Sequence, residues 1–171
     1  MQTKGWTLNA VAGVLGNMQS ESSINPGRWQ SDRVGGDPTA HGYGLVQWTP
    51  YTKYTDWIVN QGFSDPSEMD ANLYRIIYEV ENNIQWIATS TYNYSFYEFT
   101  QSTDTPYNLA LAFLANYERP ADPNQPSRGT QAEYWYEFLG GLPPIPTFIR
   151  KRKKFPWSVL TRIIKQRRTF F

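Results

Sequence analysis

The pattern of apolar positions predicts a mostly helical domain. Helical spacing begins after Thr7, a good N-cap residue, and runs through Leu8, Val11, Ala12, Leu15 and Met18. The sequence Asn25-Pro26-Gly27 stops this helix, so Glu21 is expected near its C-terminal end. Gly13 and Gly16 each disfavour a helix by about 1 kcal/mol relative to Ala. We therefore attribute them to close backbone packing against a neighbouring helix.

Three more helices are predicted downstream. Residues 65–87 open with Asp-Pro-Ser-Glu, which supplies an N-cap, a proline at N1 and an acid at N3, and they continue with an apolar stripe. A second helix is predicted from Thr105 through Leu114. The third is predicted to begin at a capping box formed by Thr130 and Glu133, and to be closed by Gly140-Gly141.

The segment between the first two helices is expected to be irregular. Residues 28–41 are polar and rich in Gly, Asp and Pro, and they predict a loop. Residues 42–48 predict either a short strand or a tight turn. The fold class is therefore mainly α (α+β), a helical domain with a small β/turn region. No apolar run approaches the roughly 20 residues that span a bilayer.

The C-terminal part of the chain has a different composition. Three prolines among residues 142–149 favour an extended linker. Residues 150–171 hold nine of the sixteen basic residues and no acid. Residues 1–149 therefore carry a net charge of −8 and the tail +9. We predict a domain over residues 1–141, a Pro-rich linker, and a basic aromatic tail.

The tail combines its basic cluster with apolar side chains. Leu160, Ile163 and Ile164 fit one helical face, which is typical of a cationic amphipathic segment. One hypothesis is binding to anionic cell-envelope polymers or a membrane surface, and an equally weighted alternative is a disordered tail or an assembly segment. Nucleic acid is not expected as a partner, because the domain is acidic and contains no nucleic-acid motif.

Composition excludes several kinds of chemistry. The chain has no Cys, so it has no disulfide, thiol nucleophile or thiolate metal site. Its single histidine, His41, cannot form a multi-histidine zinc site, and no Gly-x-Ser-x-Gly elbow accompanies it. We expect no metal and no cofactor, and the N-terminus lacks the apolar core of a signal peptide. Carboxylates remain as catalytic groups, and glycoside hydrolysis needs only those.

Glu21 is the first candidate. A general acid that cleaves a glycosidic bond must hold its proton near neutral pH. Apolar surroundings and the negative end of a helix dipole both favour the neutral form of a carboxyl group. Glu21 meets both conditions at the predicted helix end, and the alternative is an ordinary solvated glutamate.

Residues 42–48 and 116–118 supply the other candidates. Gly42 and Gly44 would let the backbone approach a sugar closely, and Gln47 offers both a donor and an acceptor. The alternative is a glycine-bearing hairpin. The candidates that complete the two segments are Tyr43, Trp48, Asn116, Tyr117 and Glu118. For the second segment, the alternative is a core tyrosine beside a surface acid.

Four stretches of this chain together resemble a known family. They are residues 13–22 (GVLGNMQSES), 44–50 (GLVQWTP), 117–120 (YERP) and 131–136 (QAEYWY). The chain resembles the phage tail lysozyme family, notably the lysozyme domain of podovirus tail-knob peptidoglycan hydrolases, over roughly residues 5–140. More distantly, it is similar to goose-type lysozymes and lytic transglycosylases.

The resemblance implies a lysozyme-like N-acetylmuramidase. It would cleave the β-1,4 bond between N-acetylmuramic acid and N-acetylglucosamine in peptidoglycan, with Glu21 as the general acid and the two candidate segments lining the glycan groove. It also implies a place at a virion tail tip or in the cell wall, with other tail proteins as partners and local wall opening during viral entry. The alternatives are a lytic transglycosylase, which gives 1,6-anhydro products, and a non-catalytic wall-binding or tail module.

The second carboxylate is expected in the loop after Glu21. Asp32 and Asp37 both lie there, and we favour Asp37 because two glycines and a proline flank it. A carboxyl separation of about 5 Å from Glu21 would predict retention, and a larger one inversion. If neither aspartate reaches the site, attack by the muramic acid 6-hydroxyl would give an anhydro product.

Overall fold

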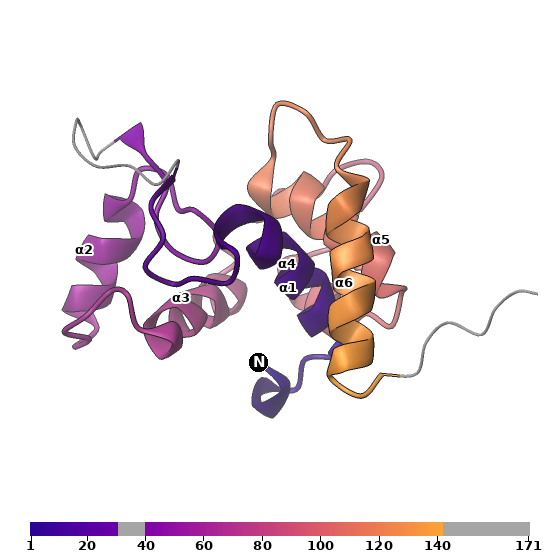
Figure 1. Cartoon of the computed structure of the whole chain (residues 1–171), viewed down its shortest axis with the longest axis horizontal. Helices are drawn as coiled ribbons and strands as arrows, with labels where there is room; N and C mark the ends of the chain where they lie inside the picture. The colour runs from indigo at the N-terminus through magenta and orange to yellow at the C-terminus, as the bar shows by residue number, and fades with distance from the viewer. Residues whose placement is uncertain (31–39, 142–171) are drawn as a thin grey trace, which may run out of the picture.

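The computed structural model describes residues 1–30 and 40–141 and is mainly helical (Figure 1). Its α-helices are α1 (Leu8–Ser22), α2 (Thr52–Asn60), α3 (Met69–Glu81), α4 (Phe96–Gln101), α5 (Pro106–Phe113) and α6 (Pro126–Phe138). Two short elements are the 3₁₀ turn η1 (Gln2–Lys4) and the π-helical turn η4 (Leu114–Glu118). The predicted fold class is therefore confirmed.

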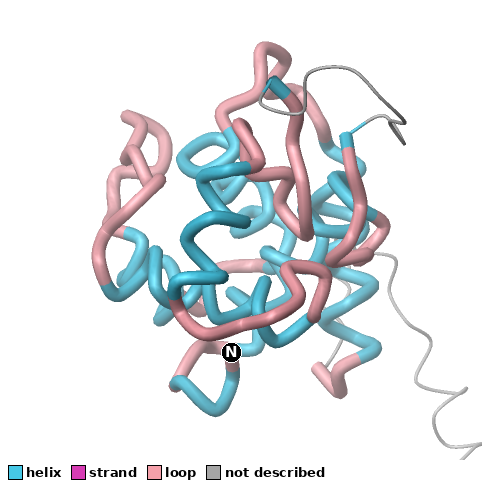
Figure 2. Tube along the Cα trace, turned by 90° about the vertical axis from the view of Figure 1, so that its left-hand side faces the viewer, coloured by secondary structure: helices cyan, strands magenta, loops and turns pink. Residues whose placement is uncertain are grey.

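The helices form two groups on either side of α1. In Figure 1, α2 and α3 lie to the left of α1, and α5 and α6 lie to its right. Figure 2 shows helices and loops alone among the described residues. β-Type pairing among these residues is limited to two isolated bridges, which join Tyr43 to Trp29 and to Trp48. Residues 42–48 thus form the tight turn that was one of the two predicted alternatives.

Local sequence explains α1. The Thr7 hydroxyl accepts a hydrogen bond from the Ala10 N–H (3.1 Å), as an N-cap should. Ser23 ends the helix in the left-handed conformation (φ 55°). Glu21 therefore lies in the last turn, as the sequence predicts. No helix of the described residues is both long and apolar enough to span a bilayer.

Two glycines bring α1 into close contact with its neighbours. A Cβ on Gly13 would lie 2.9 Å from Cβ of Leu109 in α5. A Cβ on Gly16 would overlap the carbonyl oxygen of Arg128 and lie 2.8 Å from the backbone nitrogen of Ala132, both in α6. The prediction that these glycines serve helix packing is confirmed, with one glycine facing each partner helix.

Two predicted helix starts are wrong. The Asp65 carboxylate accepts hydrogen bonds from the N–H (2.8 Å) and hydroxyl (2.7 Å) of Ser67, and this turn delays α3 until Met69. The helix ends at Glu81, short of residue 87. Helix α6 begins at Pro126, so Thr130 lies inside the helix and not at its cap. The predicted helix start at Thr105 is correct, since Thr105 caps α5. The predicted helix end before Gly140 is also correct, since Gly140 adopts a φ of 91° after α6.

Helices α2 and α4 were not predicted. Aromatic and β-branched residues, which favour strands locally, occupy much of α2. Its buried residues Tyr54 and Ile58 fix it as a helix through tertiary packing. Helix α4 is only six residues long, although Ser95 and Glu98 form a complete capping box at its start. That capping box is the sequence feature from which α4 could have been predicted.

Gly16→Ala is expected to lower the free energy of unfolding by about 1–3 kcal/mol, because the new methyl group overlaps the α6 backbone. On a solvent-facing helix the same substitution would raise stability by roughly 0.5–1 kcal/mol. Urea denaturation measures the sign directly. Gly13→Ala should cost less, since its nearest contacts are 2.9–3.1 Å. A stability gain for Gly16→Ala would contradict the packing described above.

Candidate active site

Glu21 is held by an arginine from α6. Arg128 Nη2 donates to Glu21 Oε1 in an ion pair, and the two side chains are 7% and 20% exposed. Arg128 also donates through Nη1 to Asn17 Oδ1 (3.1 Å) and through Nε to Gln125 Oε1 (2.7 Å). The guanidinium group is therefore fixed on three sides, and it presents one cation to the end of α1.

Glu118 brings a second carboxyl group to the same cluster. It is the last residue of η4, and its Oε1 is buried without a hydrogen-bond partner in the described structure. Burial raises the pKa of Glu118 well above its ordinary value of 4.5, and the nearby charge of Glu21 raises it further. Arg128 acts in the opposite direction. Glu21, Glu118 and Arg128, hereafter the acidic cluster, thus combine one cation with two electrostatically linked carboxyl groups.

The turn of residues 42–48 packs against other residues of the protein. A Cβ on Gly44 would lie 2.6 Å from Asn72 Oδ1 and 2.9 Å from the Trp48 ring, so protein atoms already fill the space expected for a sugar. Gln47 Nε2 donates to the carbonyls of Gly44 (2.8 Å) and Arg28 (3.1 Å). Both amide donors of Gln47 are therefore committed to shaping the turn.

Four of the side chains that were predicted to bind substrate are buried: Tyr43, Trp48, Asn116 and Tyr117. Asn116 accepts from the N–H and hydroxyl of Thr89 and donates to the Tyr92 carbonyl, which ties residues 89–92 to η4. Tyr117 is 1% exposed, which matches the core-tyrosine alternative for that position. Gln47 and Glu118 remain partly exposed.

A buried glutamate that the sequence analysis missed connects these segments. Glu79 in α3 is 1% exposed and accepts hydrogen bonds from Trp48 Nε1 (3.1 Å), Arg75 Nε (2.8 Å) and the Tyr117 hydroxyl. Burial raises the pKa of Glu79, while its hydrogen bonds and Arg75 oppose that shift. The available signal was an acid four residues after an arginine within a predicted apolar stripe.

Arg128 was also missed, because no local pattern marks an arginine that pairs with a residue 107 positions away. Asp32, Asp37, the linker and the basic tail lie outside the described residues. Within residues 1–30 and 40–141, no group of three His, Cys, Asp or Glu side chains could hold a metal ion.

The chain is similar to known proteins over most of its length. Residues 1–139 match the family model described as phage tail lysozyme. Morphogenesis protein 1 of Bacillus phage B103 is 56% identical over 138 residues, which cover 81% of this chain and 36% of that protein. The chain thus spans about a third of the length of this relative.

Glu118→Gln is expected to change how stability depends on pH. A carboxyl group whose pKa is raised on folding keeps its proton in the folded state while the unfolded chain ionises above about pH 4.5, so stability falls as pH rises from there toward the folded pKa. The variant does not lose stability in this way, because the glutamine amide does not ionise. Relative to wild type, the variant should therefore gain stability as the pH rises from roughly pH 4 to pH 7.5.

Urea denaturation at the two pH values measures this gain. Glu137→Gln, which changes an exposed glutamate of α6, is the matched control and should show little pH-dependent difference. An equal stability difference for Glu118→Gln at both pH values would show that Glu118 titrates normally.

Proposed function

Because the chain belongs to the phage tail lysozyme family, we propose that it is a peptidoglycan hydrolase of the N-acetylmuramidase type. It cleaves the β-1,4 bond between N-acetylmuramic acid and N-acetylglucosamine. The observation that carries this proposal is the acidic cluster, in which Glu21 at the end of α1 meets Arg128 and lies within electrostatic range of Glu118. Most glycosidases use a pair of carboxyl groups that flank the glycosidic bond.

Glu21 acts as the general acid in this mechanism. Its side chain is 20% exposed and can meet a bound glycan, whereas Oε1 of Glu118 is buried. Once Glu21 has taken up a proton, it transfers that proton to the glycosidic oxygen as the C1–O bond breaks, and Arg128 stabilises the carboxylate that this transfer leaves on Glu21. Glu118 keeps a proton close to the reacting acid.

We assign the second catalytic carboxylate to Asp37, which positions the attacking water or acts as the nucleophile. The partly exposed Gln47 lies on the wall of the glycan groove. The buried members of the two candidate segments support that wall from behind, and they are Tyr43, Gly44, Trp48, Asn116 and Tyr117. Their rings and hydrogen bonds fix the turn and η4 relative to Glu79.

The similarity to a phage protein supports a proposed biological setting. A phage morphogenesis protein that shares 56% identity supports a place in the virion, at the tail tip, where the enzyme opens the wall locally during entry. Other tail proteins are its proposed partners. Residues 150–171 are proposed to bind anionic cell-envelope polymers or the membrane surface through their basic side chains.

One observation favours lytic transglycosylase activity as the second candidate. Glu118 is the second carboxyl group of the acidic cluster, and its buried Oε1 is poorly placed to activate water. If Asp37 does not reach the site, the muramic acid 6-hydroxyl attacks C1 and the product carries a 1,6-anhydro end.

Glu21→Gln is expected to reduce glycan cleavage by about 10²- to 10⁴-fold, because the amide cannot donate the required proton. The assay incubates wild type and variant with purified peptidoglycan and identifies released fragments by mass spectrometry. Glu137→Gln is the matched control on an exposed site and should retain wild-type activity. A thermal melt of each protein tests whether it is folded, because Glu21→Gln also removes the ion pair with Arg128.

The released ends identify the reaction. Reducing muropeptides from wild type establish hydrolysis, and 1,6-anhydro ends establish transglycosylase activity. Full activity of Glu21→Gln would refute the role of Glu21. If neither protein releases fragments, the enzyme proposal fails and the chain is a wall-binding or tail module.

A further inference from the structure

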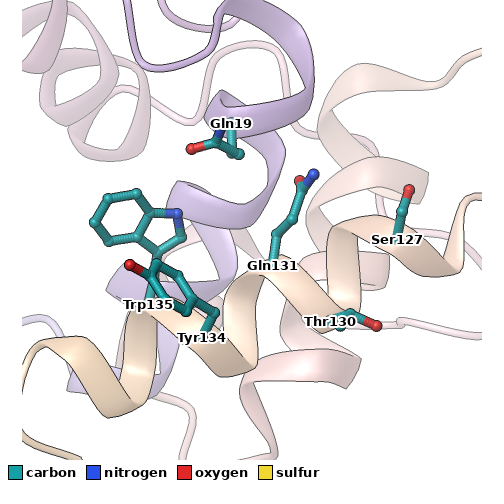
Figure 3. A pocket seen from close by; sticks show the side chains of 6 residues that line it. All are labelled: Gln19, Ser127, Thr130, Gln131, Tyr134 and Trp135. Carbon is teal, nitrogen blue, oxygen red and sulfur yellow. The ribbon is translucent and has the colours of Figure 1, made fainter.

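A pocket lies on the outer side of the contact between α1 and α6, apart from the acidic cluster. Its volume is about 540 Å³, within the range of small-molecule sites. The lining residues are Gln19, Ser127, Thr130, Gln131, Tyr134 and Trp135. Figure 3 shows Gln19 projecting from α1 and the other five side chains arranged along α6.

Helix geometry separates this pocket from Glu21. Side chains two positions apart on an α-helix point about 200° apart around its axis, so Gln19 and Glu21 point to nearly opposite sides of α1. Between them, the Ser20 hydroxyl donates to Gln131 Oε1 (2.7 Å) and closes the contact between the helices. Neither Glu21 nor Arg128 lines the pocket.

Two aromatic rings form a corner in the pocket. The ring centroids of Tyr134 and Trp135 are 5.4 Å apart, and their planes meet at 76°. Phe138 stacks on Tyr134 (6.1 Å, 22°) and contacts the edge of Trp135, so the corner is supported from one helical turn below. Tyr134 is nevertheless 60% exposed, which leaves a large apolar ring face in contact with water.

The polar part of the lining is neutral. It consists of two amides, from Gln19 and Gln131, and two hydroxyls, from Ser127 and Thr130. Gln131 uses Oε1 to accept from Ser20, so its amide N–H groups remain available as donors. Among the described residues, no Lys, Arg, Asp or Glu lines the pocket, so the chemistry of this lining does not fit a phosphate, a carboxylate or a metal ion.

We propose that this pocket is a second glycan-binding site, specific for neutral pyranose saccharides and separate from the catalytic centre. The C–H face of one sugar ring packs on Tyr134 with Trp135 as a side wall, and the amides and hydroxyls bind the hydroxyl or acetamido groups. On a polymer such as a glycan strand, a second weak site raises retention through effective concentration. Binding at this site does not depend on hydrolysis.

The test titrates triacetylchitotriose into the full-length, ¹⁵N-labelled Glu21→Gln protein. The side-chain amide signals of Gln19 and Gln131 and the indole N–H of Trp135 are expected to shift with one dissociation constant. Adding Tyr134→Ala should weaken that constant at least tenfold. Tyr97→Ala is the matched control, because Tyr97 is 64% exposed on α4 and does not line the pocket, and it should leave the constant within twofold.

Three outcomes would overturn the proposal. The first is the absence of shifts at these signals, the second is a dissociation constant that Tyr134→Ala leaves unchanged, and the third is shifts confined to residues around Arg128 such as Asn17 and Gln125. Cleavage of peptidoglycan by wild type reports separately on the proposed function. Binding here without cleavage would refute the enzyme proposal alone, and cleavage without binding here would refute the second site alone.

Discussion

The ion pair between Arg128 and Glu21 is the contact on which the arrangement of the site depends. Arg128 is 7% exposed, and a buried cation is tolerated only where partners compensate its lost hydration. Glu21 and Asn17 of α1 and Gln125, the residue before α6, supply those partners. Gly16 makes this possible, because any larger residue would collide with the backbone of α6 at Arg128 itself. The same close contact therefore packs the helices and places a cation beside the candidate acid.

A second buried charge holds the other half of the site. Glu79 joins Arg75 of α3, Trp48 of the tight turn and Tyr117 of η4 around one carboxyl group. Tyr117 directly precedes Glu118, so a shift of this network would move the second carboxyl group of the acidic cluster. The π-helical turn is thus the link between the two buried charges, and such turns often occur at functional sites.

Several features that depend on local sequence patterns were predicted correctly from the sequence. The cap at Thr7, the end of α1 near Glu21, the packing glycines and the helix from Thr105 all follow from periodicity and capping chemistry. The start of α3 was misplaced because Asp65 forms a local turn, which competes with capping. Arg128 was missed because its partner Glu21 lies 107 positions away, and Glu79 was missed although its local spacing to Arg75 was visible within the predicted apolar stripe. Sequence motifs also mark a candidate segment without distinguishing exposed side chains from buried ones, as the burial of Trp48, Asn116 and Tyr117 illustrates.

The protonation of Glu118 is the property that connects this packing to the proposed acid catalysis. It can be observed directly by ¹³C NMR titration of glutamate carboxyl carbons, with Glu118→Gln used for assignment. We predict that the Glu118 signal keeps its protonated shift well above pH 4.5, and that Arg128→Met raises its pKa further by removing the opposing cation. A Glu118 signal that titrates near pH 4.5, unaffected by Arg128→Met, would show that the two carboxyl groups and the arginine do not act as one site.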